Sequence, residues 1–256
     1  MGTESKNCCV FNKHILKSLK LLLQKIILFS GLAGVTVFIG GLLAKYFNHH
    51  IKETPVKYEI IHTLMSFGAG IILSAVTLVL IPKGMEELKV LPMALSFGGG
   101  VIIFLLIDRY LAKKVGKNAT LLAMLMDFIP ESIALGATFA IEPNLAILLA
   151  VFIGLQNLPE AFNAYRDLIL SGFTEKKTLI IFFFLSFFGI GGALIGHYFL
   201  TDFPIITAHL MTFSSGGILY LLINDIIPES KLENNYLTSL GATLGFLVGI
   251  VGEKII

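Results

Sequence analysis

The sequence is poor in charge for its length. Asp, Glu, Lys and Arg make up 14% of its 256 residues, whereas soluble domains carry about 25%. Tryptophan is absent, and the only two cysteines, Cys8 and Cys9, are adjacent. An adjacent pair excludes a framework of spaced disulfides and has no metal-ligand spacing. The net charge is only +2 and most basic residues fall in loops, which argues against nucleic acid as a partner.

The sequence is instead rich in long apolar runs. Hydrophobic residues make up 55% of the chain, and the mean hydropathy is +0.86. Runs of about 20 apolar residues cross the hydrocarbon core as helices, because lipid offers the backbone no other hydrogen-bond partner. The sequence therefore predicts an all-α integral membrane protein, surrounded by the lipid bilayer, with a single polytopic domain over 1–256 that begins with a polar tail at 1–20. We expect eight transmembrane helices, at approximately 21–44, 60–82, 91–107, 119–141, 145–165, 178–200, 204–227 and 236–252.

The distribution of Lys and Arg predicts the orientation in the membrane. The loops after the first, third, fifth and seventh segments hold eleven of these residues, against two in the loops after the second, fourth and sixth. Because cytoplasmic loops are enriched in Lys and Arg, we expect both termini outside, across a plasma or inner membrane. Lysines near the N-terminus favour the opposite orientation, but several loops agree with one another and carry more weight.

Two pairs of apolar segments have similar sequences. "SFGAGIILSAVTLVLIPKG" and "TFSSGGILYLLINDIIPES" align when Pro82 is placed on Pro228, an offset of 146 residues. The segments around Pro130 and Pro159 align in the same way at an offset of 29. Each pair joins an even-numbered segment to an odd-numbered one, so the two copies cross the membrane in opposite directions. This predicts a 3+2+3 inverted repeat with proline kinks in the fourth and fifth helices, a pattern typical of transporters with a site near the midplane.

The fourth and fifth segments each place a Pro-Glu pair at mid-membrane, within "DFIPES" and "QNLPEA". A proline frees the carbonyl four residues earlier, so each motif exposes a backbone oxygen close to its carboxylate. Asp127 and Glu131 share one helix face, and Gln156, Glu160 and Asn163 share a face of the next segment. If the two faces meet, carboxylates and amides converge halfway across the bilayer.

Carboxylates at this depth need a compensating charge. Burying one at the bilayer centre costs roughly 2.5–3.5 kcal/mol on insertion scales, and we expect no Lys or Arg at a matching depth. A divalent cation or protons would compensate. A second candidate station, formed by Asn224, Asp225 and Glu229, ends the seventh segment. Asp108 begins a basic loop, where we expect it to be solvated.

Eight helices, short loops and paired Pro-Glu motifs resemble the ZIP family of divalent metal ion transporters. The resemblance covers nearly the whole chain, including "GGILYLLINDIIPES". It implies that Asp127, Glu131, Gln156, Asn157 and Glu160 occupy metal-binding positions, that the metal is a transported substrate, and that the chain needs no cofactor and is no enzyme. It further implies that zinc, iron or manganese moves toward the cytoplasm, that one helix bundle shifts against another, and that the chain forms a homodimer.

The chain also departs from the pattern that the family shows. Its fourth-helix motif typically reads His-Asn-x-Pro-Glu-Gly, whereas this chain has Asp127 and Phe128 at the first two positions. The second segment ends in Pro82-Lys83, where the family commonly has Pro-Glu. The sixth segment has no carboxylate, which some family members use for a second metal, so we expect a single site. Without His or Cys among the expected ligands, we expect this site to prefer hard ions such as Mn²⁺ or Fe²⁺ to Zn²⁺. Two alternatives stay open: a proton-coupled carrier of another solute, and an intramembrane hydrolase with Asp127 and Asp225 as its acid pair.

Overall fold

Helices joined by short connections make up the part of the chain that the computed structural model describes, residues 3–51, 54–114, 119–232 and 236–255. These residues contain no strand, which confirms the all-α expectation. Two turns of π-helix, η1 (Val76–Leu80) and η3 (Leu222–Ile226), interrupt the α-helices. The α-helices are α1 (Thr3–His50), α2 (Pro55–Ala75), α3 (Ile81–Glu87), α4 (Val90–Lys114), α5 (Ala119–Thr138), α6 (Pro143–Leu170), α7 (Glu175–Leu185), α8 (Phe188–Leu200), α9 (Pro204–Leu221), α10 (Ile227–Ser230) and α11 (Tyr236–Ile255).

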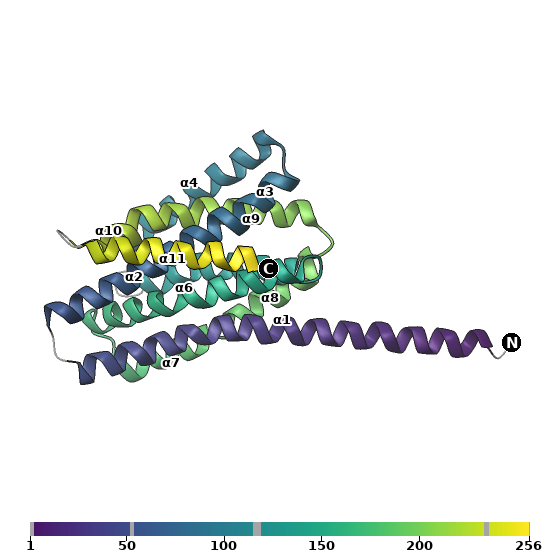
Figure 1. Ribbon diagram of the computed structural model, residues 1–256, viewed down its shortest axis with the longest axis horizontal. Coiled ribbons are helices and arrows are strands. Elements are labelled where there is room, and N and C mark those ends of the chain that lie inside the picture. The colour runs from purple at the N-terminus through teal and green to yellow at the C-terminus, as the bar shows by residue number, and fades with distance from the viewer. Residues whose placement is uncertain (1–2, 52–53, 115–118, 233–235, 256) are drawn as a thin grey trace.

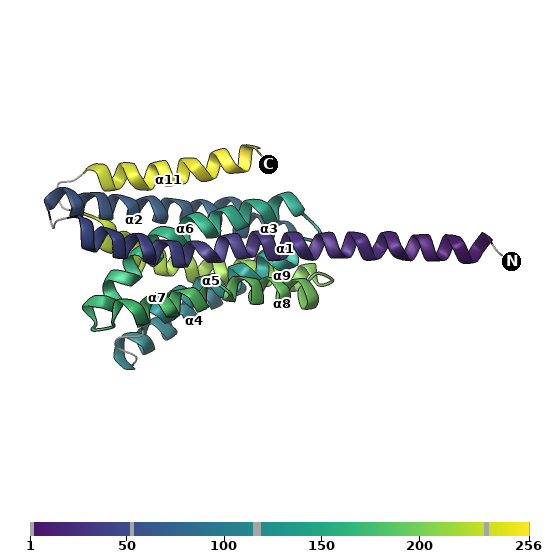
Figure 2. The ribbon, with the colours of Figure 1, turned by 90° about the horizontal axis from the view of Figure 1, so that it is seen from below.

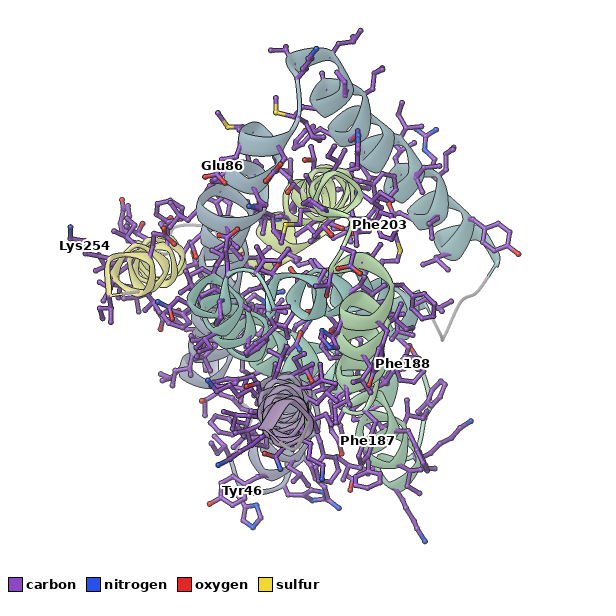
Figure 3. All side chains as sticks on the ribbon, turned by 90° about the vertical axis from the view of Figure 1, so that its right-hand side faces the viewer. Tyr46, Glu86, Phe187, Phe188, Phe203 and Lys254 are labelled. Atoms are coloured by element: carbon purple, nitrogen blue, oxygen red, sulfur yellow. The ribbon has the colours of Figure 1, made fainter. Side chains whose placement is uncertain are left out.

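The helices are long and apolar enough for a membrane. Within the described residues, seven helical stretches meet this requirement by length and composition. The 20-residue helix α5, which carries Asp127 and Glu131, is the eighth long helix. Apolar side chains also cover the outside: Phe187, Phe188 and Phe203 are about half exposed and point away from the helices in Figure 3. Such a surface is stable against lipid, so the chain is an integral membrane protein.

Local sequence explains where several helices begin and end. Pro55 occupies the first turn of α2, where its missing N–H costs nothing, and the Thr54 hydroxyl accepts a hydrogen bond from the Lys57 N–H at 3.1 Å. Beyond the end of α6, Gly172 has φ 90°, a conformation that favours glycine. At the N-terminus, α1 starts at Thr3, so the stretch expected as a polar tail continues the helix from residue 3 onward. In Figures 1 and 2 this helix projects far beyond the other helices.

The helices form two bundles. Bundle 1 contains α1 and α5 to α8, in which α1 packs along α6 and α5 packs along α8. Bundle 2 contains α2 to α4 and α9 to α11, in which α2 packs along α11 and α4 packs along α9. The bundles meet where α2 contacts α6 and where α5 contacts α9. The inverted repeat pairs α5 with α6, α1 with α7 and α8, α2 with α9, and α4 with α11. Under this pairing the α1–α6 contact corresponds to α5–α8, the α2–α11 contact to α4–α9, and the α2–α6 contact to α5–α9.

The inverted repeat also extends to the backbone. The offset of 146 residues superimposes Val76–Leu80 on Leu222–Ile226, the two π-helical turns, each of which ends just before an Ile-Pro pair. Close contacts repeat as well: a Cβ atom would collide with the Ala242 carbonyl at Gly70, and with the Phe97 carbonyl at Gly216, its partner in the repeat. Small residues allow such close approach between membrane helices. The predicted inverted repeat is therefore confirmed.

Candidate functional site

The two Pro-Glu motifs face each other where α5 contacts α6. Pro130 lies inside α5 and Pro159 inside α6, and each is followed by its glutamate. The side-chain amide of Gln156 donates a hydrogen bond of 2.6 Å to one carboxylate oxygen of Glu131. Both residues are almost fully buried, with exposed fractions of 1% and 0%. The α5 and α6 faces expected to meet thus do so.

Three oxygen atoms at this contact have no hydrogen-bond partner among the described residues. They are Oε1 of Glu131, Oε1 of Gln156 and Oε2 of Glu160, and all three are shielded from solvent. A buried acceptor without a donor costs free energy, and a buried carboxylate costs more unless a positive charge is near. The three oxygens therefore form an electron-rich pocket wall to which a cation is the complementary group.

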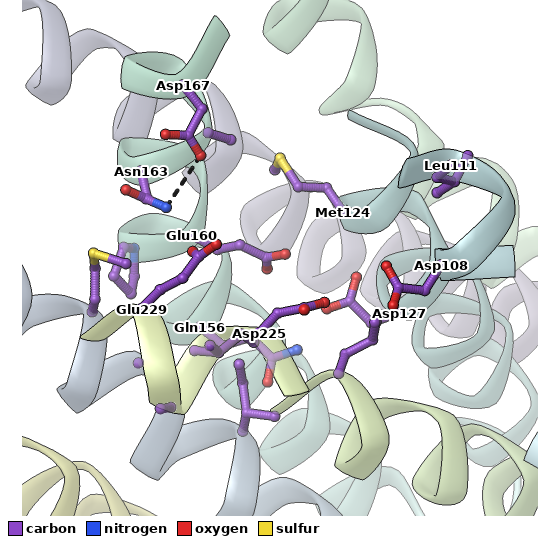
Figure 4. Close-up of a pocket in the computed structure, with 18 residues that line it drawn as sticks. Asp108, Leu111, Met124, Asp127, Gln156, Glu160, Asn163, Asp167, Asp225 and Glu229 are labelled. Carbon is purple, nitrogen blue, oxygen red and sulfur yellow. Dashed lines mark hydrogen bonds between the residues drawn. The ribbon is translucent and has the colours of Figure 1, made fainter. Parts of the chain in front are cut away.

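Gln156 and Glu160 line an acidic cavity, and Glu131 is linked to it through its hydrogen bond with Gln156. The cavity has a volume of about 260 Å³, and Asp127, Gln156, Glu160 and Asn163 are among the residues that line it (Figure 4). None of its described lining residues is Lys, Arg or His. Four further carboxylates line it, from Asp108, Asp167, Asp225 and Glu229. Cations are thus attracted along its whole length, because low-dielectric walls focus the field of like charges.

The carboxylates also show which way the cavity runs. Asp167 and Glu229 lie close to the ends of α6 and α10, and Asp108 lies in the last third of α4, on the side of the loop that follows this helix. We call this side, with the loops after α1, α4, α6 and α10, the cavity end. The opposite side carries the loops after α3, α5 and α8, and we call it the lysine end after Lys83. Both chain termini lie toward the lysine end in Figures 1 and 2.

One expected site residue lies apart from the others. Asn157 is buried and donates a hydrogen bond of 3.4 Å to the backbone carbonyl of Ala33 in α1, and it does not line the cavity. It follows Gln156 directly, and neighbouring residues of an α-helix point about 100° apart. Asn163 does line the cavity, and its amide donates a hydrogen bond of 3.4 Å to Asp167. The structure thus brings Asn163 to the site and leaves Asn157 in the contact with α1.

The second candidate station is only partly assembled. Asp225 and Glu229 line the cavity, whereas Asn224 is exposed and donates hydrogen bonds to Asp108 at 3.3 Å and to Asp225 at 2.7 Å. Asp108 was expected at the start of a loop, and this placement was wrong, although its side chain is partly exposed. It lies within α4, lines the cavity and accepts a hydrogen bond of 2.9 Å from the Tyr220 hydroxyl. Helix α4 continues seven residues beyond the apolar run, so Asp108 lies on a helix next to the cavity and not in a loop.

Among the cavity-lining residues that sequence reasoning missed, Asp167, Met65 and Met124 carry an oxygen or sulfur atom in the side chain. A signal for Asp167 was present, since it continues the face of Gln156, Glu160 and Asn163 by one further helical turn. The two methionines gave no signal, because methionine is common in apolar segments. Across the described residues, the His, Cys, Asp and Glu side chains do not gather in groups of three or more that could hold a metal ion without further ligands. A cation here would thus meet amide as well as carboxylate oxygens.

An all-α membrane fold with an inverted repeat and an acidic, partly buried cavity defines a membrane transporter for cations. Comparison with known families agrees: the profile of the family described as ZIP zinc transporter matches residues 108–252. This is more than half of the chain, and the chain therefore belongs to the ZIP zinc transporter family. The family transports divalent metal ions, which sets aside the intramembrane hydrolase and makes the metal a substrate. No curated protein matches the chain.

The profile match begins near the end of α4 and leaves α1, α2 and α3 outside it. The inverted repeat connects these helices to the matched region. The π-helical turn before Pro82 repeats the turn before Pro228, which lies within the match. The unmatched helices are thus the other half of the same architecture.

Proposed function

We propose that this chain carries a divalent transition-metal ion across the membrane through a site formed by Asp127, Glu131, Gln156 and Glu160. One observation carries the proposal: Glu131, Gln156 and Glu160 each present a buried oxygen that has no donor among the described residues. A divalent cation satisfies several such oxygens at once, whereas a proton satisfies one or two. Asn163 stands next to this set along α6 and contributes to the same site, whereas Asn157 supports the helix contact behind it.

The donor chemistry indicates which metal is preferred. Every proposed ligand side chain offers oxygen, since Asp127 stands where the family pattern has His. Oxygen donors suit hard ions, and imidazole suits zinc. We therefore expect Mn²⁺ and Fe²⁺ to compete well against Zn²⁺, with one metal ion bound at a time. Met124 lines the same cavity, but a thioether is a weak ligand for these ions and does not reverse the preference.

The direction follows from the loops and the cavity together. The loops of the cavity end are the lysine- and arginine-rich ones, so we propose that this end faces the cytoplasm of a plasma or inner membrane and that both termini lie outside. Metal then leaves the central site along Asp167, Asp225 and Glu229, with Asn224 holding Asp225 in place. Assembly as a homodimer belongs to the same proposal, and cross-linking in membranes tests it.

Purified protein in liposomes with an internal metal-sensitive dye tests the function directly. We expect uptake of Mn²⁺ or Fe²⁺ by the native chain and its loss in Glu131→Ala and Glu160→Ala, each with normal membrane insertion. Glu253→Ala is the matched control, because Glu253 is an exposed glutamate near the end of α11, outside the cavity lining. Near-native uptake in both site variants refutes the site. A flux driven by pH alone, with no metal uptake, refutes the proposal in favour of a proton-coupled carrier.

A further inference from the structure

An ion pair joins the two bundles at the lysine end. The ammonium group of Lys83 in α3 lies 2.6 Å from a carboxylate oxygen of Glu142, the residue that precedes α6. The same ammonium lies 3.6 Å from Glu86 and 3.5 Å from Glu87, both within α3. Because α3 belongs to bundle 2 and Glu142 leads into α6 of bundle 1, the shortest of the three contacts bridges the bundles. The other two only pre-orient the lysine.

Lys83 is also where the inverted repeat loses its symmetry. The offset of 146 residues places Lys83 on Glu229 and Val79 on Asp225. The offset of 29 places Thr138 on Asp167. Three carboxylates that line the cavity at one end thus correspond to a lysine, a valine and a threonine at the other.

Burial shows that the lysine end is packed. Val79 has an exposed fraction of 1% and Thr138 of 4%, whereas their counterparts Asp225 and Asp167 line the cavity. The Lys83 side chain itself is only 13% exposed. The repeat therefore predicts that Lys83, Val79 and Thr138 line a new cavity when the lysine end opens. In that state the ion pair between Lys83 and Glu142 is broken.

We propose that the Lys83–Glu142 ion pair holds the lysine end shut, and that Lys83 is the positioning residue that biases the transporter toward the state open at the cavity end. The inference rests on the proposed function, because it assumes that the central site is reached from both ends in turn. A contact made in one state and broken in the other shifts the equilibrium between them. A partly exposed pair of this kind shifts it by about two- to fivefold.

Thiol labelling tests the proposal without any transported metal. The background carries Cys8→Ser and Cys9→Ser, since these are the only cysteines of the chain. Thr138→Cys reports opening at the lysine end, and Leu111→Cys, in the cavity lining, reports opening at the cavity end. With a maleimide in detergent, we expect Lys83→Gln to raise the labelling rate at position 138 about two- to fivefold and to lower the rate at position 111.

Matched variants distinguish the loss of the Lys83–Glu142 ion pair from a general change of charge near Lys83. Glu142→Gln should reproduce the effect, and Glu86→Gln should leave both rates unchanged, because Glu86 contacts Lys83 only within α3. The double variant Lys83→Glu with Glu142→Lys retains an ion pair between the two positions with the charges exchanged. It should restore the native labelling rates, even if a single variant folds poorly.

Unchanged rates in Lys83→Gln and Glu142→Gln would overturn the inference. An equal change in Glu86→Gln would do the same, since it would point to local charge. Because the experiment contains no metal, a labelling shift that persists while metal uptake fails would reject the proposed function alone.

Discussion

The two ends of the molecule share one architecture and differ in chemistry. At both ends a π-helical turn precedes an Ile-Pro pair, and a glycine packs against a backbone carbonyl of the neighbouring helix. The cavity end then adds carboxylates and an accessible space, while the lysine end adds an ammonium group and close packing. The comparison teaches that the repeat gives both ends the same helix packing. The few positions at which the two halves differ in residue type decide which end is open.

The largest effect should come from breaking the shared architecture. Gly100→Val would push a side chain into the Phe213 carbonyl, and Gly245→Val into the Phe67 carbonyl, its counterpart in the repeat. We expect each to destabilise the protein by about 1–3 kcal/mol, through overpacking. Heating in detergent followed by size-exclusion chromatography measures the loss of folded protein.

Gly98→Val is the control for this pair, because a Cβ atom there meets nothing within 4 Å. Similar losses in the Gly100 and Gly245 variants would support equal mechanics at the two ends. A large loss in one and none in the other would contradict the symmetry.

A second prediction gives a position at the cavity end the residue type of its counterpart at the lysine end. Glu229→Lys places the charge of Lys83 into the acidic cavity, where its repulsion of a passing cation is worth on the order of 1–2 kcal/mol at an effective dielectric constant near 20. We expect metal uptake to fall roughly tenfold, with Glu229→Gln showing a smaller loss. Uptake into liposomes measures both, and native uptake by Glu229→Lys would remove Glu229 from the metal path.

A third prediction concerns the centre that both ends share. Asp127→His restores the ligand that the family pattern has at this position, and imidazole favours zinc over manganese. We expect the ratio of zinc to manganese uptake to rise several-fold, with total uptake largely retained. Competition between the two ions in one assay gives the ratio. An unchanged ratio would mean that Asp127 does not contact the metal.

The smallest effect should come from Asn157→Ala. Its amide contacts the Ala33 carbonyl at 3.4 Å, a long hydrogen bond, and its side chain does not line the cavity. We expect less than a twofold change in the KM for metal, against a clear increase for Gln156→Ala, which removes the donor to Glu131. A large rise in KM for the Asn157 variant would return this residue to the metal site.

The sequence predicted most of the architecture and the centre of the site, for physical reasons. Helical spacing brought Asp127 and Glu131 to one face and Gln156 and Glu160 to another, and the structure shows that these faces meet. Spacing could not show that α4 extends far enough to place Asp108 in the cavity. Nor could it pair Lys83 with Glu142, 59 positions apart. An inverted repeat is equally compatible with either end being open, so the open end had to come from the fold.

Helix α1 gives one more consequence. Its 48 residues span about 72 Å at 1.5 Å per residue, more than twice the roughly 30 Å of a hydrocarbon core. It packs along α6 and also contacts α7 and α8, so it is rigidly attached to bundle 1. If this bundle tilts or slides, α1 moves with it, and a small displacement at the site becomes a larger one at the start of α1. A fluorophore near the start of α1 would therefore act as a pointer, reporting each change of access in a single molecule.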